Sequence, residues 1–278
     1  MIHLVARLPH APFSNRNHAA PFWRKFKKQF PEALAAVLMP NHLHLLLPRS
    51  SPAQMAWRRL DYLIRSSPFQ WEPIPQPVPV PDEKHALRQI RYIALNPCRA
   101  GLTQDPLEWP WSTYRGCFGG VAQPWVSLDV LAELLGWDSV GAFRTWFHKY
   151  VSSDPTVNPT GTPVLKLNHL SENQTYPHLE NLIAATLVAA EATPAVLLGS
   201  CKESVEIGSV IVHLAEEYEW KQSGLLATRL LCTSRTVQRY RRRKPNALLF
   251  RAAKLCLNDN RLTSTFLKMS SNATFFQK

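Results

Sequence analysis

The sequence predicts an α+β fold in which an antiparallel sheet with covering helices is followed by a mainly helical C-terminal region. Short apolar runs and longer amphipathic stretches alternate over about the first 120 residues, in the order βαββαβα. Prolines at alternate positions from 73 to 81 forbid a helix there and place an extended strand at a sheet edge. Beyond Gly119-Gly120 the apolar spacing is helical. The order of elements in the first region is the one that a ferredoxin-like sheet needs.

Each element of the first region follows from a local pattern. Apolar runs bounded by proline and asparagine predict strands over residues 2–8, 34–39 and 42–47, with a turn at Pro40-Asn41. Helical spacing predicts helices over residues 15–30, 52–65 and 86–95, and residues 70–80 are extended. Pro31 ends the first helix, and Pro97 is expected to close the third helix and to start the next one.

The composition indicates a nucleic-acid partner. The 278-residue chain carries 32 Lys+Arg against 20 Asp+Glu, a formal net charge of +12. Such an excess attracts phosphate backbones without selecting a sequence. Hydrophobic residues make up 45% of the chain, which provides ample material for a core and excludes a disordered protein.

Cysteines and apolar runs bear on the location of the protein. The five cysteines are scattered, odd in number and without a CxxC pair, as is typical of reduced thiols in a cytoplasm. The N-terminus lacks the basic region and long apolar stretch of a signal peptide. No apolar run approaches the roughly 18 residues of a membrane span. We therefore expect a cytoplasmic monomer or homodimer without membrane contact.

His42 and His44 stand two residues apart in the short apolar run 42–47. On a strand, side chains two apart share one face and stand roughly 6.5–7 Å apart along the backbone. Two imidazoles at that spacing can lean toward one metal ion, while Leu43, Leu45 and Leu47 face the opposite way into a core. A pair of hydrogen-bonded histidines at a sheet edge is the alternative.

Tyr92 and Asn96 stand four residues apart on the third predicted helix and its end. They therefore share one face, with about 5–6 Å between their Cβ atoms. A nucleophile and a metal ligand on one rigid element keep the fixed distance that in-line attack on phosphorus requires. The phenol would need a base or a nearby cation to lose its proton. In the alternative, Tyr92 packs on the core with its hydroxyl bonded to backbone.

Three motifs occur in order within residues 1–118. They are Met-Pro-Asn-His-Leu-His at 39–44, Tyr-Ile-Ala-Leu-Asn-Pro-Cys-Arg-Ala-Gly-Leu at 92–102, and Trp-Pro-Trp-Ser-Thr-Tyr-Arg at 109–115. Together they resemble the single-tyrosine HUH transposase superfamily, and within it the REP-associated tyrosine transposases. The resemblance implies a ferredoxin-like HUH core that cuts and rejoins single-stranded DNA, expected to contain a hairpin. It also implies a divalent metal and a covalent 5′-phosphotyrosine.

Position by position, the resemblance implies that His42 and His44 bind the metal, that Tyr92 is the nucleophile and that Asn96 completes the metal shell. Mixed imidazole and amide ligands suit Mn²⁺, and Mg²⁺ when several waters are retained. The proline-rich segment 73–81 departs from the family, whose members have a longer helix and an aromatic, basic strand there. This departure affects the expected binding of DNA and recognition of a hairpin more than the expected chemistry, because His42, His44, Tyr92 and Asn96 are all present.

Two basic segments are further candidates for DNA contact. Residues 23–28 and the helix predicted over 52–65 mix cations with aromatic side chains, and such a mixture can hold phosphates and bases together. The candidate residues are Arg24, Lys25, Lys27, Lys28, Arg58 and Arg59. An amphipathic helix with a solvated basic face is the alternative for both segments.

The C-terminal region is expected to contain a helix-turn-helix. Helices are predicted over residues 128–135, 140–150, 182–190, 205–220, 223–231 and 234–243, with a linker at 152–180. The last two helices flank a turn near Cys232-Thr233, and the second carries Arg235, Arg239 and Arg242 as candidate contacts to duplex DNA. A structural helix bundle with a solvated basic end is the alternative.

The predicted domains are a catalytic HUH domain (1–120), a helical extension with a linker (121–180), a helical, possible DNA-binding domain (181–262) and a flexible tail (263–278). Three functions are compatible with these observations. The first is the metal-dependent single-strand endonuclease and strand transferase. The second is a non-catalytic DNA-binding regulator derived from such an enzyme. The third is an unrelated metallohydrolase that uses His42 and His44 with His85 or Glu83.

Overall fold

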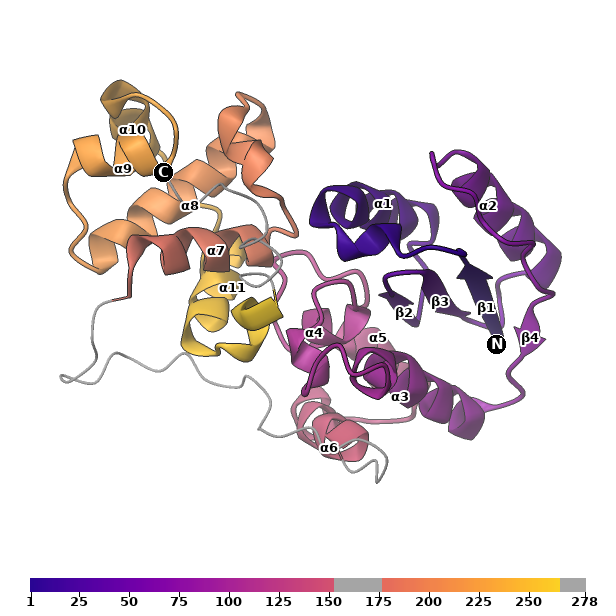
Figure 1. Cartoon of the computed structure of the whole chain (residues 1–278). Coiled ribbons are helices and arrows are strands. Elements are labelled where there is room, and N and C mark those ends of the chain that lie inside the picture. The colour runs from indigo at the N-terminus through magenta and orange to yellow at the C-terminus, as the bar shows by residue number, and fades with distance from the viewer. Residues whose placement is uncertain (153–176, 266–278) are drawn as a thin grey trace. The chain divides into compact units, whose positions relative to one another are not determined.

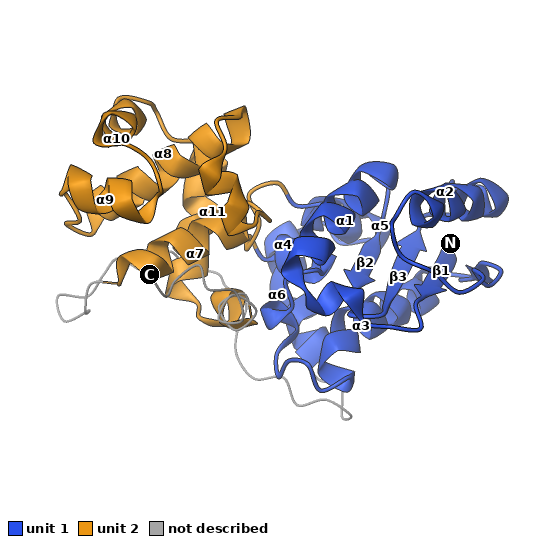
Figure 2. Cartoon of the chain, turned by 45° about the horizontal axis from the view of Figure 1, so that its top comes forward, with its two compact units in different colours: residues 1–118, 124–163 blue, residues 119–123, 164–278 orange. Residues whose placement is uncertain are grey.

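A computed structural model describes residues 1–152 and 177–265 of the chain. Within these residues the chain forms two compact units (Figure 2). Unit 1 contains residues 1–118 and 124–152, and unit 2 contains residues 119–123 and 177–265. Most of the predicted linker over 152–180 and most of the predicted tail after residue 262 lie outside the described residues. The domain boundaries drawn from the sequence stay predictions.

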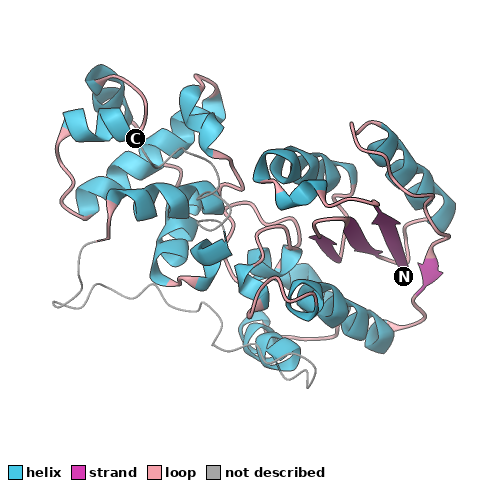
Figure 3. Cartoon of the chain, in the orientation of Figure 1, coloured by secondary structure: helices cyan, strands magenta, loops and turns pink. Residues whose placement is uncertain are grey.

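Unit 1 is built on a four-stranded antiparallel sheet, which confirms the predicted α+β class (Figure 3). The strands are β1 (Ile2–Arg7), β2 (Ala35–Leu38), β3 (His42–Leu47) and β4 (Val78–Pro79). They lie in the order β2-β3-β1-β4, as in a ferredoxin-like sheet. The histidine strand β3 is therefore central, while β4 lies at an edge as the prolines predict.

Helices cover both faces of this sheet. The helices α1 (Arg16–Gln29) and α2 (Ala53–Arg65) lie on one side, and α3 (Glu83–Arg99) crosses the other (Figure 1). Leu43, Leu45 and Leu47 are completely buried. His44 instead points to α3, where it contacts Asn96. The alternation of the strand thus separates an apolar layer from a polar one.

The helix α3 is longer than the sequence predicts. The expectation that Pro97 closes it is wrong, because Pro97 lies inside the last turn and the helix continues to Arg99. Pro97 is buried, so packing offsets the one helical hydrogen bond that a proline cannot make. The chain turns away at Gly101, whose φ of 67° is left-handed, and the Leu102 N–H donates to the Pro97 carbonyl at 2.9 Å.

The Trp-Pro-Trp-Ser-Thr motif lies along the outer edge of β2. The Leu38 N–H donates to the Trp111 carbonyl, and the Trp109 indole N–H donates to the Leu38 carbonyl, both at 2.9 Å. Thr113 Oγ1 accepts from the Ala36 N–H at 3.0 Å and donates to the Ala36 carbonyl at 3.2 Å. This part of the motif therefore satisfies the outer backbone groups of Ala36 and Leu38 in β2.

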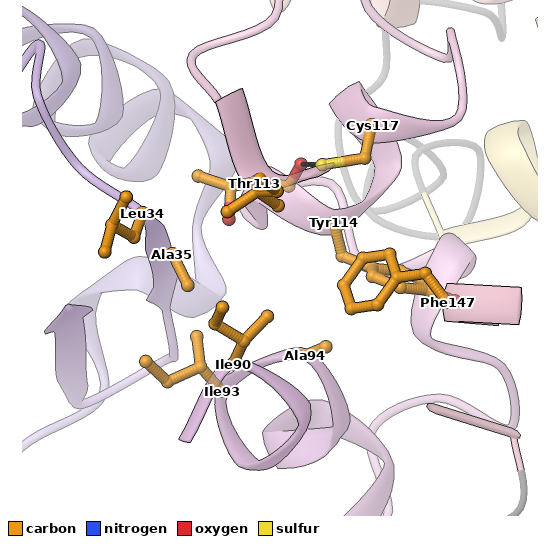
Figure 4. A pocket seen from close by; sticks show the side chains of 10 residues that line it. Leu34, Ala35, Ile90, Ile93, Ala94, Thr113, Tyr114, Cys117 and Phe147 are labelled. Atoms are coloured by element: carbon orange, nitrogen blue, oxygen red, sulfur yellow. Dashed lines mark hydrogen bonds between the residues drawn. The ribbon is translucent and has the colours of Figure 1, made fainter. Parts of the chain in front are cut away.

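The remaining elements of unit 1 are η1 (Pro12–Ser14), η2 (Pro106–Glu108), α4 (Thr113–Cys117), α5 (Leu128–Leu134) and α6 (Val140–Ser152). A cavity of about 10 Å³ lies between α3 and α4 (Figure 4). Side chains such as Ile90, Ile93 and Phe147 line it. An apolar space with room for about one water molecule is a packing gap rather than a binding site.

Unit 2 is helical, as the sequence predicts. Its elements are α7 (Leu179–Ala189), η3 (Pro194–Leu198), α8 (Lys202–Glu217), α9 (Ser223–Arg229), α10 (Ser234–Arg241) and α11 (Ala247–Asn258). The long helices α7, α8 and α11 bury apolar residues along most of their length. Across both described stretches of the chain, we find no helix with the length and apolar character needed to span a bilayer.

Candidate active site

The two histidines of β3 lie on the α3 side of the sheet. His44 is buried at 3% exposure, and His42 is half-buried at the start of the strand. Their ring centroids are 5.0 Å apart and the rings are perpendicular. The alternation of the strand therefore brings both imidazoles to one side, one deep in the site and one at its rim.

The helix α3 presents a stripe of polar side chains to these rings. Asn96 Nδ2 lies 3.1 Å from His44 Nε2. One turn earlier, the Tyr92 ring stands perpendicular to the His44 ring, with 5.5 Å between centroids. Asn96 is buried, whereas Tyr92 keeps 41% of its surface exposed. The structure thus groups all four of the predicted catalytic and metal-binding residues, with the tyrosine open to solvent.

A third histidine, His3, contacts the His44 ring, and the sequence analysis did not identify it. His3 on β1 lies with its Nε2 3.1 Å from His44 Nδ1, and the two rings stack. Gln89 Nε2 lies 3.3 Å from His3 Nε2. The sequence held two signals for these residues. His3 stands in a predicted strand, where side chains alternate between the two faces as they do around His44, and Gln89 stands three residues before Tyr92 on the same helical face.

These contacts fit one pattern of protons. Asn96 donates through its amide N–H to His44 Nε2, which leaves the ring proton of His44 on Nδ1. His44 Nδ1–H then donates to His3 Nε2. His44 Nε2 therefore carries its lone pair toward Asn96, on the side where Tyr92 and His42 also lie.

Burial keeps the imidazoles neutral. It lowers the pKa of His3 to about 4. Burial, with repulsion from His3, His42 and Arg7, lowers the pKa of His44 to about 3. The pKa of His42 is also lowered, mainly by burial and further by Arg7, while a hydrogen bond that His42 donates to the Asn96 side chain opposes the shift. A neutral imidazole is the form that can bind a metal.

The donor set fits a divalent metal. No group of three His, Cys, Asp or Glu in residues 1–152 and 177–265 is arranged to hold a metal, so the third protein ligand would have to be another donor. The Asn96 amide supplies one beside His44 Nε2. A half-turn of the amide would bring its oxygen to the position now taken by Nδ2, and two imidazoles with one amide oxygen suit Mn²⁺ or Mg²⁺.

Two arginines bring positive charge to this site. The Arg99 guanidinium lies 5.1 Å from the centroid of the Tyr92 ring. Arg7 is exposed, and it stands directly opposite His42 where β1 and β3 run side by side. The site therefore attracts anions, and a phosphate that approaches the Tyr92 hydroxyl would do so toward a cation.

The basic segment of α1 lies on the other face of the sheet. Trp23 and Phe26 are buried in the core, so the idea that these aromatic rings stack on bases is wrong. The cations of the same segment are exposed or half-buried: Arg24, Lys25, Lys27 and Lys28. The segment is thus an amphipathic helix with a basic outer face, and DNA contact through its cations stays a prediction.

The two arginines of α2 differ in their surroundings. Arg59 forms an ion pair with Glu32 at 2.5 Å, and its guanidinium lies 4.5 Å from the centroid of the Phe30 ring. It also donates to the Gln29 carbonyl. Arg59 therefore holds α2 to the end of α1, which is a structural role. Arg58 is exposed, and its contact with DNA stays a prediction.

The geometry disfavours the metallohydrolase. His85 sits at the start of α3, where its Nδ1 lies 2.7 Å from Asp82 Oδ1. It precedes Asn96 by 11 residues, or roughly 16 Å along a helix at 1.5 Å per residue. Glu83 is two residues farther away. Neither can share a metal with His44, which lies against Asn96.

Tyr62 and Tyr114 are poor substitutes for Tyr92. Tyr114 is buried, and its hydroxyl lies 2.8 Å from His148 Nδ1. Tyr62 is 69% exposed but stands on α2, across the sheet from the histidines.

The candidate DNA contacts of unit 2 are exposed: Arg235 and Arg239 lie on α10, and Arg242 lies at its end.

Comparison with known proteins leaves the family open. No protein-family model matches the chain, and no curated protein sequence matches it. A solved structure of a REP-associated tyrosine transposase bound to a REP hairpin is similar, with 19% sequence identity and a TM-score of 0.34. The similarity covers 41% of this chain and 76% of that one. At these values it is a distant structural likeness, and no function is taken from it.

Proposed function

We propose that this protein is a metal-dependent single-strand DNA endonuclease and strand transferase that acts through a covalent 5′-phosphotyrosine on Tyr92. The observation that supports this most directly is the position of Asn96 beside His44 Nε2, with the exposed Tyr92 one helical turn away. This grouping would bring the proposed nucleophile close to the three proposed metal ligands.

His42, His44 and Asn96 would hold the metal, Mg²⁺ or Mn²⁺. When bound, it would polarise the scissile phosphate and stabilise the departing oxygen. His3 would fix the tautomer of His44 through the hydrogen bond to Nδ1, as a supporting residue does in metal sites. Arg99 would draw the phosphate toward the Tyr92 hydroxyl.

The reaction is a pair of phosphoryl transfers. In the first, Tyr92 Oη loses its proton and attacks phosphorus, the P–O3′ bond breaks, and the 3′ oxygen gains a proton. The 5′ phosphate of the DNA stays on the tyrosine. In the second, an incoming 3′-hydroxyl attacks this phosphorus and releases the tyrosine. One phosphodiester bond is lost and one is made, so the exchange needs no external energy source.

A non-catalytic DNA-binding regulator is the second candidate. The exposed cations of α10 favour it, because they could bind DNA whether or not Tyr92 reacts. The two candidates differ in one observable, which is the covalent adduct.

The test is to mix the full chain with labelled single-stranded oligonucleotides that contain hairpins, with Mn²⁺ or Mg²⁺ present, and to look for a labelled species in denaturing electrophoresis. We expect an adduct that chelator prevents. Tyr92→Phe should fold and bind DNA but give no adduct, because it lacks only the attacking oxygen.

Tyr62→Phe is the matched control, because it removes an exposed hydroxyl from the opposite face of the sheet and should leave the adduct unchanged. An adduct that survives in Tyr92→Phe would show that another residue is the nucleophile. A wild-type protein that binds these strands but never forms an adduct would support the regulator.

A further inference from the structure

The helices α9 and α10 are joined by a tight turn of defined geometry. The Cys232 N–H donates to the Ala227 carbonyl at 2.9 Å, and the Leu231 N–H donates to the Thr228 carbonyl at 3.3 Å. Leu231 has a φ of 53°, the left-handed conformation that such a helix end requires. Thr233 then caps α10 by accepting a hydrogen bond from the Thr236 N–H at 3.2 Å.

The helix α10 is fixed against α8 along its inner side. Gly208 of α8 lies so close to the Tyr240 ring that a Cβ there would stand 2.5 Å from it. The Ser209 hydroxyl donates to the Tyr240 carbonyl at 3.2 Å. Arg241 pairs with Glu216 at 2.5 Å and also donates to Ser223 Oγ. Arg241 therefore has a structural role, and α10 has one defined orientation.

The outer side of α10 carries a basic stripe. Arg235, Arg239 and Arg242 are spaced at i, i+4 and i+7, so they share one helical face, and all three are exposed. Asp and Glu are absent from the sequence between Glu219 and Asp259. The stripe is thus a cationic surface on a helix whose opposite side is anchored.

We propose that α9 and α10 form a helix-turn-helix that binds duplex DNA, with the basic stripe of α10 in the major groove. The two short helices and their tight turn are the elements of that motif, and the major groove, about 12 Å wide, admits one helix. Arginine can pair with guanine edges or with phosphates there.

Duplex DNA fits this surface better than other nucleic acids do. Single strands are bound by exposed aromatic rings, and Tyr240, the aromatic residue of α10, is buried. The major groove of double-stranded RNA is too deep and narrow for side chains to read. This binding would not depend on Tyr92 or on a metal, so it stands apart from the proposed catalysis.

The experiment measures binding of the full chain to a labelled 20-base-pair DNA duplex by fluorescence anisotropy between 50 and 200 mM KCl. The test variant combines Arg235→Ala, Arg239→Ala and Arg242→Ala. We expect the slope of log affinity against log salt to fall by about 0.9 for each DNA phosphate that the variant no longer neutralises. Affinity at 100 mM salt should fall at least tenfold.

A matched control removes three cations from other parts of unit 2: Lys202→Ala, Lys221→Ala and Arg251→Ala. It has the same charge change, so an equal loss of duplex binding would overturn the proposal in favour of net charge alone. Unchanged duplex binding in the stripe variant would also overturn it, as would a loss confined to single-stranded DNA.

Two further measurements keep these outcomes distinct. Circular dichroism must give the stripe variant the same helical content and melting temperature as the wild type. A variant with Lys at the three stripe positions keeps the charge and should retain salt-dependent binding, while discriminating less between duplex sequences. Adduct formation on a short single strand reports on Tyr92 separately, and it should be unchanged in the stripe variant.

Discussion

The polar stripe of α3 and the basic stripe of α10 have similar helical spacing but opposite surroundings. On α3, Gln89 and Asn96 reach neighbours at 3.3 and 3.1 Å within the site. On α10, Arg235, Arg239 and Arg242 are exposed, and Arg239 also lies 5.9 Å from the centroid of the Tyr240 ring. The difference teaches that one spacing can serve two purposes. Polar groups that are packed against a sheet keep fixed distances, as bond-breaking requires, whereas exposed cations can follow the surface of a partner.

The largest effect is expected from substitutions that disrupt the α3 site and leave unit 2 intact. His42→Ala or His44→Ala should reduce adduct formation by more than the roughly 100-fold that is typical when a supporting residue of a metal site is removed. Mn²⁺ binding, measured by calorimetry, should weaken in parallel. Asn96→Ala should impair both less, because water can take the place of an amide oxygen. Full activity of either histidine variant would refute the metal site, and duplex binding by unit 2 serves as the internal control.

The second effect concerns pH and the buried histidines. In the unfolded chain an imidazole has a pKa near 6.5, while burial holds the pKa of His3 at about 4. The unfolded state therefore binds more protons as the pH falls from 6.5 to 4, and the metal-free protein loses stability there, by roughly 3 kcal/mol for His3.

Urea unfolding at pH 7.5 and pH 5, followed by tryptophan fluorescence in the presence of chelator, measures the part of this loss that is present at pH 5, about 2 kcal/mol for His3. Eight of the nine tryptophans lie in residues 1–152, so the signal reports mainly on unit 1. His3→Gln keeps much of the volume but cannot take up a proton, so its stability should depend less on pH. An equal pH dependence in the two proteins would contradict the assignment to His3.

The third effect breaks unit 2 alone. Gly208→Ala would place a methyl group 2.5 Å from the Tyr240 ring, and overpacking of this kind costs about 1–3 kcal/mol. Both units contain helices, so unit 2 is followed through the part of the far-ultraviolet circular dichroism curve that does not track tryptophan fluorescence, and this part should shift to lower urea. The tryptophan transition and adduct formation should stay as in the wild type; if both shift together, the two units do not unfold independently.

The smallest effect sharpens the turn of the helix-turn-helix. Leu231 is half exposed and left-handed, a conformation that costs a non-glycine residue roughly 1 kcal/mol. Leu231→Gly should therefore stabilise unit 2 by up to about 1 kcal/mol, in the same circular dichroism assay. Leu231→Ala is the control, because alanine has the same steric conflict and should bring no gain.

The sequence was most informative where a residue's role depends on its own strand or helix. The alternation of His42 and His44, and the spacing of Tyr92 and Asn96, are local properties, and they predicted which side chains would face one another. The partner of Arg59 was not predictable in this way, because Glu32 comes from a distant part of the chain. His3 was missed because one histidine on a first strand gains meaning only when its neighbour strand is known.

Local rules also failed where packing overrides them. Proline usually ends a helix, yet Pro97 is buried inside the last turn of α3. Aromatic residues among cations suggested a nucleic-acid surface, but Trp23 and Phe26 form core on the inner side of α1. Both outcomes depend on contacts with residues that are distant in the sequence, and a short sequence segment does not contain that information.

The hydrogen bonds along β2 have a consequence for solubility. An unpaired strand at a sheet edge can recruit strands from other molecules and so begin aggregation. Here Trp111 and Thr113 take up the outer groups of Leu38 and Ala36, and the opposite edge is the two-residue strand that contains Pro79. The outer edge of β2 is thus closed to added strands, and the opposite edge offers only a short strand that proline interrupts. Copies of this protein should therefore resist polymerisation through the β2 edge of the sheet.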